Sequence, residues 1–150
     1  MVPIHDITTD TEDPPSFVDV LPHRRWAWNP PGYSGPAVAA QQRAAWPEIE
    51  PLETRTDRAR VHVAAREAMR RAGWQIVGDD MAAGRLEAIA VTPWLRFRDD
   101  VVVRLRDRPE GGTRVDVRSK SRLGRSDLGT NARRVLEYLR DLRQRLDTTS

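Results

Sequence analysis

The chain contains no cysteine among its 150 residues. Disulfide bonds, thiolate metal sites and cysteine nucleophiles are therefore excluded. The sequence also lacks a run of about 18 to 20 apolar residues, the length that a membrane-spanning helix requires, and its N-terminus lacks the pattern of a signal peptide. No GxSxG motif, phosphate-binding loop or dinucleotide fingerprint occurs. We therefore expect no cofactor, and no familiar class of enzyme is indicated.

The two parts of the chain carry net charges of opposite sign. Residues 1–57 carry nine acidic and four basic side chains, a net charge of −5, whereas residues 58–150 carry thirteen acidic and twenty-one basic ones, a net charge of +8. Either the acidic part lies against the basic part, or the basic part offers a surface to phosphates or anionic lipid. Nucleic acid is not an expected partner, because aspartates interrupt the basic residues and no row of stacking aromatics accompanies them.

Proline divides the chain into two regions. Residues 1–57 hold nine of the eleven prolines, which disfavours long helices and central strands. This region is nevertheless too rich in aromatic and branched apolar residues to be a disordered tail. We predict an extended N-terminal arm over residues 1–57 that packs on the domain, with a short helix over residues 37–45.

Residues 58–150 show regular periodicity. A first helix begins after Thr56 or Asp57 and stops at Gly73, and a last helix runs from Asp127 to Leu146 with one apolar stripe. Four strand-like runs lie between them, at Trp74–Val77, Arg85–Thr92, Val101–Leu105 and Thr113–Ser119. The pattern predicts an α+β domain in which a four-stranded antiparallel sheet is flanked by two helices, in the order α-β-β-β-β-α.

The last two strand-like runs predict a hairpin whose register has two alternatives. Both alternatives bury the valines of the two strands on a common face. One alternative places Asp100 across from Arg118, and a slip of two residues places Asp100 across from Lys120 instead. In either register Asp100 faces a cation.

The densest chemical signal is RSKSRLGRSDLGTN, residues 118–131. Arginine side chains suit carboxylate or phosphate oxygens, and the first amides of a helix beginning near Ser126 attract negative charge. This segment could therefore bind an anion near the paired aspartates. The candidate binding residues are Arg118, Ser119, Ser121, Arg122, Gly124, Ser126, Asp127, Asn131, Asp99 and Asp100.

The same residues also allow two other interpretations. In a structural one, Arg118 pairs with Asp100 across the hairpin and Ser126 or Asp127 caps the helix. In a catalytic one, Asp99 and Asp100 are the acid/base pair of a hydrolase and the arginines clamp an anion, although adjacent residues of a strand point to opposite faces. The three histidines fit no familiar ligand spacing, and we expect no metal site.

Several motifs resemble a known family. The run FRDDVVVRLRDRPEGGTRVDVRSKSRLGRSDLGTN, preceded by AGWQIV and RLEAIAVT, is similar to domain-of-unknown-function family 1499. The segments IHDITTDTEDPPSF and AAQQRAAWPEIEPL also resemble it, so the resemblance covers nearly the whole chain. Its most specific pieces are Asp99-Asp100, VRSxSR ending at Arg122 and SDLGxN ending at Asn131.

The resemblance implies no activity, because the family has none established. Its bacterial members often place membrane-spanning segments ahead of this domain. We therefore expect a chain that is soluble as given and membrane-tethered in its full-length form. The leading hypothesis is a non-catalytic binding or assembly module whose partner is an anionic small molecule, a lipid headgroup or a membrane protein; a hydrolase using Asp99 or Asp100 is the alternative.

Overall fold

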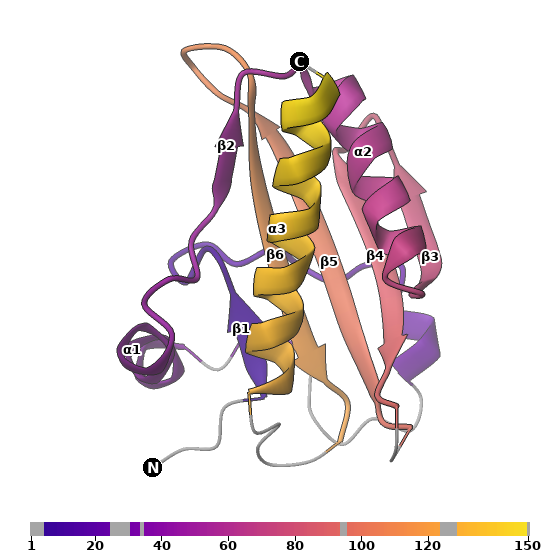
Figure 1. The fold of residues 1–150 in the computed structure, drawn as a ribbon. Coiled ribbons are helices and arrows are strands. Elements are labelled where there is room, and N and C mark those ends of the chain that lie inside the picture. Colours follow the sequence, from indigo (N-terminus) through magenta and orange to yellow (C-terminus); the bar gives the residue numbers. More distant parts are fainter. Residues whose placement is uncertain (1–4, 25–30, 34, 94–95, 124–128, 150) are drawn as a thin grey trace.

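The computed structural model describes residues 5–24, 31–33, 35–93, 96–123 and 129–149. Within these residues the chain forms one antiparallel sheet, three α-helices and one short 3-10 helix (Figure 1). In chain order the elements are β1 (Asp6–Thr8), η1 (Leu21–Arg24), α1 (Pro36–Ala45), β2 (Leu52–Thr54), α2 (Arg58–Arg71), β3 (Gln75–Asp80), β4 (Arg85–Val91), β5 (Arg98–Asp107), β6 (Thr113–Ser121) and α3 (Thr130–Thr149).

The α+β class and the antiparallel sheet are confirmed, but the predicted count of four strands and two helices is too low. The described residues contain six strands in the order β1-β6-β5-β4-β3, with β2 paired to the first half of β6. The two missed strands, β1 and β2, have three residues each, which is too short for an alternating pattern to be recognised. The third helix, α1, covers the segment for which a short helix was expected.

The hairpin between β5 and β6 has the second of the two predicted registers. Lys120 is the Cα partner of Asp100, and Val117 is the partner of Val103. Arg118 instead lies opposite Val102. The predicted pairing of Arg118 with Asp100 is therefore wrong, because the register is shifted by two residues.

The ends of the helices follow local chemistry. The Asp57 side chain accepts a hydrogen bond of 3.0 Å from the amide of Arg60, which caps α2 as predicted. Gly73 follows α2 with a φ of 79°, a conformation that glycine adopts without strain. The helix α3 begins at Thr130 after Gly129, so the predicted start at Asp127 lies outside the described residues.

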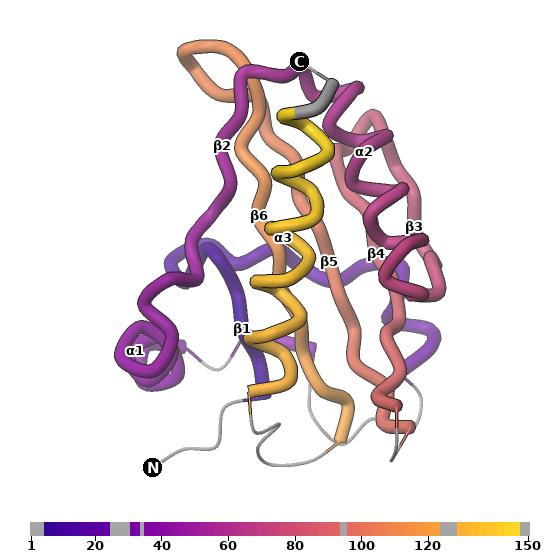
Figure 2. Tube along the Cα trace, in the orientation of Figure 1, coloured from indigo at the N-terminus to yellow at the C-terminus, as the bar shows by residue number. Residues whose placement is uncertain are grey.

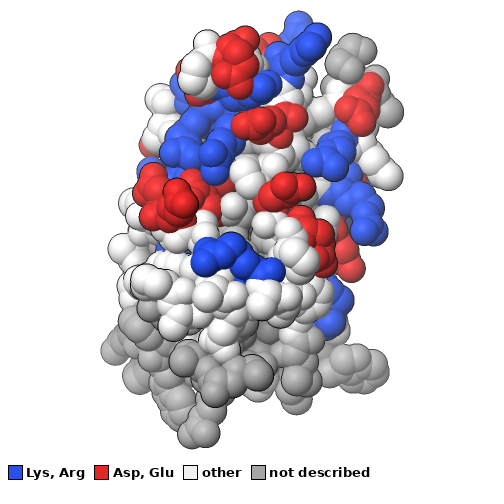
Figure 3. Space-filling model, turned by 90° about the vertical axis from the view of Figure 1, so that its left-hand side faces the viewer, with Lys and Arg blue, Asp and Glu red and all other residues white. Residues whose placement is uncertain are grey.

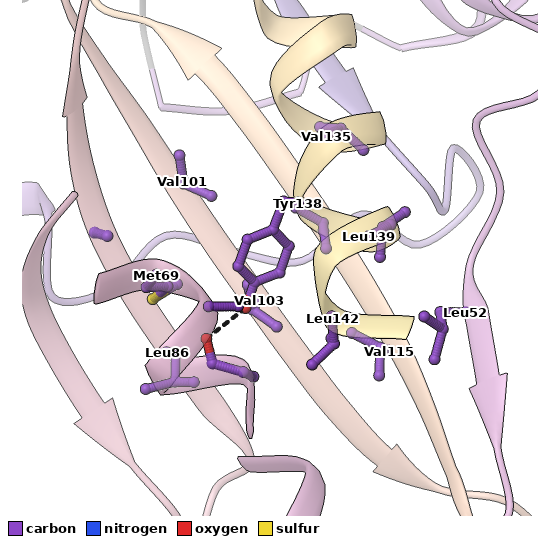
Figure 4. Packing of buried hydrophobic residues seen from close by; sticks show 14 of the residues in the cluster. Leu52, Met69, Leu86, Val101, Val103, Val115, Val135, Tyr138, Leu139 and Leu142 are labelled. Atoms are coloured by element: carbon purple, nitrogen blue, oxygen red, sulfur yellow. Dashed lines mark hydrogen bonds between the residues drawn. The ribbon is translucent and has the colours of Figure 1, made fainter. Parts of the chain in front are cut away.

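One face of the sheet is covered by α2 and α3, which lie side by side across it (Figure 1). Figure 4 shows apolar side chains of the strands and both helices meeting in this layer. The Tyr138 hydroxyl donates a 2.8 Å hydrogen bond to the carbonyl of Ala65, and its ring stacks on Trp74 with 5.1 Å between centroids. These contacts make the helix side of the sheet the main hydrophobic core.

The described part of the N-terminal segment, residues 5–24 and 31–33, leads from β1 at the edge of the sheet to the opposite face of the sheet, as the indigo trace in Figure 2 shows. We call this segment the arm and the face that it covers the arm face. Only a small apolar cluster forms here, where Phe17 and Val20 pack on Val102. Most of the arm face is polar, and three of the predicted site residues, Asp100, Arg118 and Arg122, lie on it.

Candidate functional site

The sheet separates the predicted site residues into two groups. Because side chains alternate along a strand, Asp100, Arg118 and Arg122 contact the arm, whereas Asp99 and Ser119 contact α3. The expectation that the paired aspartates point to opposite faces is confirmed. They cannot share a proton.

Arg118 is held in a buried cage on the arm face. The Nε and Nη2 atoms of Arg118 donate to the two carboxylate oxygens of Asp6 at 2.9 and 2.8 Å. Its Nη1 atom donates to the carbonyl of Pro15, and Nη2 also donates to the carbonyl of Pro31, both at 2.9 Å. The Phe17 ring stacks over its guanidinium, 4.6 Å from centroid to Cζ. Arg118 is 3% exposed. Four of its five donors are therefore occupied by the chain itself.

Asp100 lies at the centre of a second buried cluster. Arg122 donates to the Asp100 carboxylate through Nε at 3.1 Å and through Nη2 at 2.8 Å. Arg24 of η1 forms a second ion pair with the same carboxylate, from the arm. Arg122 also donates to the carbonyl of His23 at 2.7 Å. Asp100 is fully buried, so this pair of arginines fixes η1 to the start of β5.

Lys120, the only lysine of the chain, lies between these clusters with no exposed surface. Its Nζ atom donates to the carbonyl of Gly32 at 2.5 Å and lies 3.4 Å from the Asp6 carboxylate. Burial lowers the pKa of the Lys120 amine, and the Asp6 charge opposes this shift only in part. Asp6 is thus shared by two cations.

Further ion pairs extend along the arm face. Asp10 of the arm and Asp116 of β6 share a group of strand arginines, consisting of Arg104, Arg106 and Arg114. The Glu87 carboxylate accepts hydrogen bonds from the amides of Val18 and Asp19 at 2.8 and 2.6 Å. The prediction that acidic residues of the arm lie against basic strands is confirmed.

The group on the helix side forms a compact polar network below the start of α3. Ser119 donates to the Asn131 side chain at 2.6 Å, and Asn131 donates to Ser121 at 2.9 Å. Arg134 bridges Asp99 and Asn131 at 2.7 and 2.9 Å. The structure therefore brings together four of the predicted residues here.

Several partners escaped prediction. Asp6, Arg24 and Glu87 are far in the sequence from the residues that they bind. The charge asymmetry between the two parts of the chain was a signal for Asp6, and it gave none for Arg24 or Glu87. Arg134 could have been found, since it lies one helical turn after Asn131. The predicted residues Gly124, Ser126 and Asp127 lie outside the described residues.

Two hollows border these networks. A groove of about 620 Å³ between α2 and α3 reaches Arg134 and is lined by Trp74, Pro93 and Glu137. A smaller hollow of about 390 Å³ lies over Arg118 between Phe17 and Tyr33. Burial raises the pKa of the Tyr33 phenol to about 12, so that it stays protonated at neutral pH.

Metal and membrane features were also sought in the part of the chain that the structure describes. No group of three or more histidine, aspartate or glutamate side chains there is placed to hold a metal ion. Nor is any helix of that part long and apolar enough to cross a membrane. On the side shown in Figure 3, charged side chains crowd the upper part of the surface, and the described surface toward the lower end is mainly uncharged.

The sequence was compared with known families and proteins. The family described as "Protein of unknown function (DUF1499)" matches residues 6–142. No curated protein matches the chain. The resemblance found in the sequence motifs is therefore confirmed over nearly the whole chain.

Proposed function

Because this chain belongs to the DUF1499 family, for which no function is known, we propose from its geometry that it is a non-catalytic binding module that works at a membrane surface. The state of its buried charges supports the non-catalytic part of the proposal, and the membrane part extends what the family resemblance implies. Asp99, Asp100, Arg118 and Arg122 are all engaged by other groups of the chain. They hold the arm and α3 in place, and this is the role that the geometry favours for them.

An acid/base reaction finds little support in this arrangement. A general acid or base must reach a substrate within hydrogen-bonding distance, but Asp99 and Asp100 are 2% and 0% exposed and face opposite sides of the sheet. A hydrolase built on these aspartates would need at least one ion pair to open. We therefore favour binding over hydrolysis.

The predicted anion site needs the same revision. The donors of Arg118 and Arg122 are directed at Asp6, Asp100 and backbone carbonyls, so an incoming anion would compete with buried carboxylates. Exposed arginines can bind an anionic partner without displacing a buried carboxylate. Two of these, Arg96 and Arg98, lie at the end of the sheet where α3 begins.

Vesicle flotation tests the proposal. The purified chain is mixed with vesicles made of equal parts of phosphatidylcholine and phosphatidylglycerol, or of phosphatidylcholine alone. We expect the chain to float with the anionic vesicles at low salt and to be released as salt is raised, because screening shortens electrostatic attraction to about 10 Å at 0.1 M.

A chain that floats with neither kind of vesicle would overturn the membrane role. A parallel screen of ester and phosphate-ester substrates tests the absence of catalysis. Turnover that disappears in both Asp99→Asn and Asp100→Asn, in variants that remain folded, would establish the hydrolase instead.

A further inference from the structure

We infer that the chain docks on anionic bilayers through one end of its sheet, formed by Val91, Arg96, Phe97, Arg98 and Leu123. We call this surface the apolar-basic end. The inference rests on the proposed membrane role and identifies the surface responsible.

The sheet register brings these residues to one place. Val91 ends β4 and is the Cα partner of Arg98, which begins β5. The amide of Arg122 donates to the carbonyl of Arg98 at 3.2 Å, which extends the ladder between β5 and β6 by one residue. Phe97 directly precedes Arg98, and Leu123 directly follows Arg122, so these two residues come next beyond the β5–β6 ladder. The ends of β4 and β6 and the start of β5 lie at the lower end of the sheet in Figure 1.

The apolar side chains of this end stay outside both hydrophobic clusters. Val91, Phe97 and Leu123 are 45%, 43% and 37% exposed. A fourth exposed residue, Leu21 at 44%, lies on η1, which Arg24 fixes to the same end of β5. Exposed apolar side chains at the ends of adjoining strands can together form a contact surface.

Arg96 and Arg98 give the described part of this end a positive charge. Arg96 and Arg98 are exposed, and neither has an acidic side chain within ion-pairing distance among the residues that the structure describes. The carboxylates in the adjoining strand residues are Asp99 and Asp100, and both are buried and paired. Arginines beside an apolar side chain suit an anionic bilayer, since their stems can lie along the apolar layer while the guanidinium reaches the phosphates.

The size of the surface favours a bilayer over a protein partner. A stable protein interface buries about 800 Å² on each partner, which corresponds to about 20 to 30 residues. The apolar-basic end offers three exposed apolar side chains, Val91, Phe97 and Leu123, at the ends of β4 and β6 and the start of β5. Such side chains need only enter the headgroup layer, where each buried apolar group adds to the electrostatic attraction.

Matched variants test the inference by flotation with the anionic vesicles described above. Phe97→Ser with Leu123→Ser removes the apolar contact, and Arg96→Gln with Arg98→Gln removes the charge. We expect the apolar pair to weaken binding by about tenfold or more. The arginine pair should weaken it by about 30-fold at low salt and make the remainder insensitive to salt.

Two control pairs carry the same substitutions elsewhere. Val18→Ser with Val63→Ser alters apolar side chains that are each 44% exposed, and Arg140→Gln with Arg143→Gln alters exposed arginines on α3. Both controls should float like the original chain. Circular dichroism confirms that each variant is folded, and the glutamine variants, which remove no buried group, keep the test valid if a serine variant unfolds.

The outcomes separate the two proposals. If the original chain binds vesicles and the variants of the apolar-basic end bind equally well, this surface is wrong while the membrane role stands. If the controls lose as much binding as the test variants, the attraction is unspecific and the surface is again wrong. If the original chain binds no vesicle, both proposals fail.

Discussion

The same strands present apolar side chains on one face of the sheet and charged side chains on the other. On the helix face, β5 and β6 present Val101, Val103, Val115 and Val117 to the amphipathic helices. On the arm face, the same strands present charged residues, among them Asp100, Arg104, Asp116 and Arg118. The strands and their register are shared, whereas the side chains and the covering layer differ between the two faces.

The difference shows what each face contributes. Apolar burial is non-directional and scales with area, so the helix face supplies stability without fixing each contact. Buried ion pairs require a defined geometry. Removal of one member lowers the stability of the fold, because it leaves the other charge buried without a partner. Beyond β1 the described residues of the arm form no strand, and Glu87 accepts hydrogen bonds from three of their amides, those of Val18, Asp19 and Val20. The charged face therefore sets the position of the arm.

Asp100→Ala should give the largest effect of a single substitution in this comparison. It leaves the guanidinium groups of Arg24 and Arg122 buried without their carboxylate. We expect the free energy of unfolding to fall by about 3–5 kcal/mol, measured by urea denaturation. A loss below about 1 kcal/mol would mean that water reaches these arginines and that the arm is not fixed here.

Asp99→Ala sharpens the comparison, because the adjacent aspartate faces the other side. Its partner Arg134 keeps contacts to Ser119 and Asn131 and borders the groove between α2 and α3. We expect a smaller loss of about 1–3 kcal/mol in the same urea experiment. If Asp99→Ala lowered the free energy of unfolding as much as Asp100→Ala, the proposed difference between the two faces would be wrong.

A polar contact within the apolar face should matter less. Tyr138→Phe removes the hydrogen bond to the carbonyl of Ala65 but keeps the ring stacked on Trp74. We expect a loss of about 1 kcal/mol. Trp74→Leu serves as the reference for the stack, and a Tyr138→Phe variant that loses more than this reference would indicate that the hydrogen bond, not the packing, dominates.

The apolar half of the fold was predictable because its signals are local. Alternation of valines in β5 and β6 and the stripe of α3 follow from neighbouring residues. The hairpin register was narrowed to two choices, and the sequence could not choose between them because both bury the same valines. Strands as short as β1 and β2 carry too few residues for any periodicity to be seen.

The charged half was predictable only as a tendency. The acidic arm and basic strands indicated an attraction, but Asp6 and Arg118 are 112 residues apart, and any of several carboxylates could have been the partner. The predicted site residues divide into two networks because neighbouring residues of a strand point to opposite faces of the sheet. Alternation assigned Asp99 and Asp100 to different faces, but nothing local showed which element would cover each face.

Lys120→Met should have the smallest effect near neutral pH, and its pH dependence gives the sharpest test of the arm face. Asp6 keeps its two contacts with Arg118 after the substitution, so we expect a change within about 1 kcal/mol. The Lys120 amine is surrounded by Asp6 of β1, Arg118 of its own strand and Arg24 of η1, and burial lowers its pKa below the ordinary value of 10.5.

Between that lowered pKa and 10.5 the unfolded chain binds a proton that the folded chain has released. The stability of the original chain relative to Lys120→Met must therefore rise as pH rises through this window and must be lowest below it. Tyr33, with its pKa of about 12, titrates in both proteins and cancels in the difference. Urea denaturation of both proteins from neutral pH to about 10 measures the slope. A flat difference would show that Lys120 keeps its solvation in the folded chain and that the arm does not exclude water from this face.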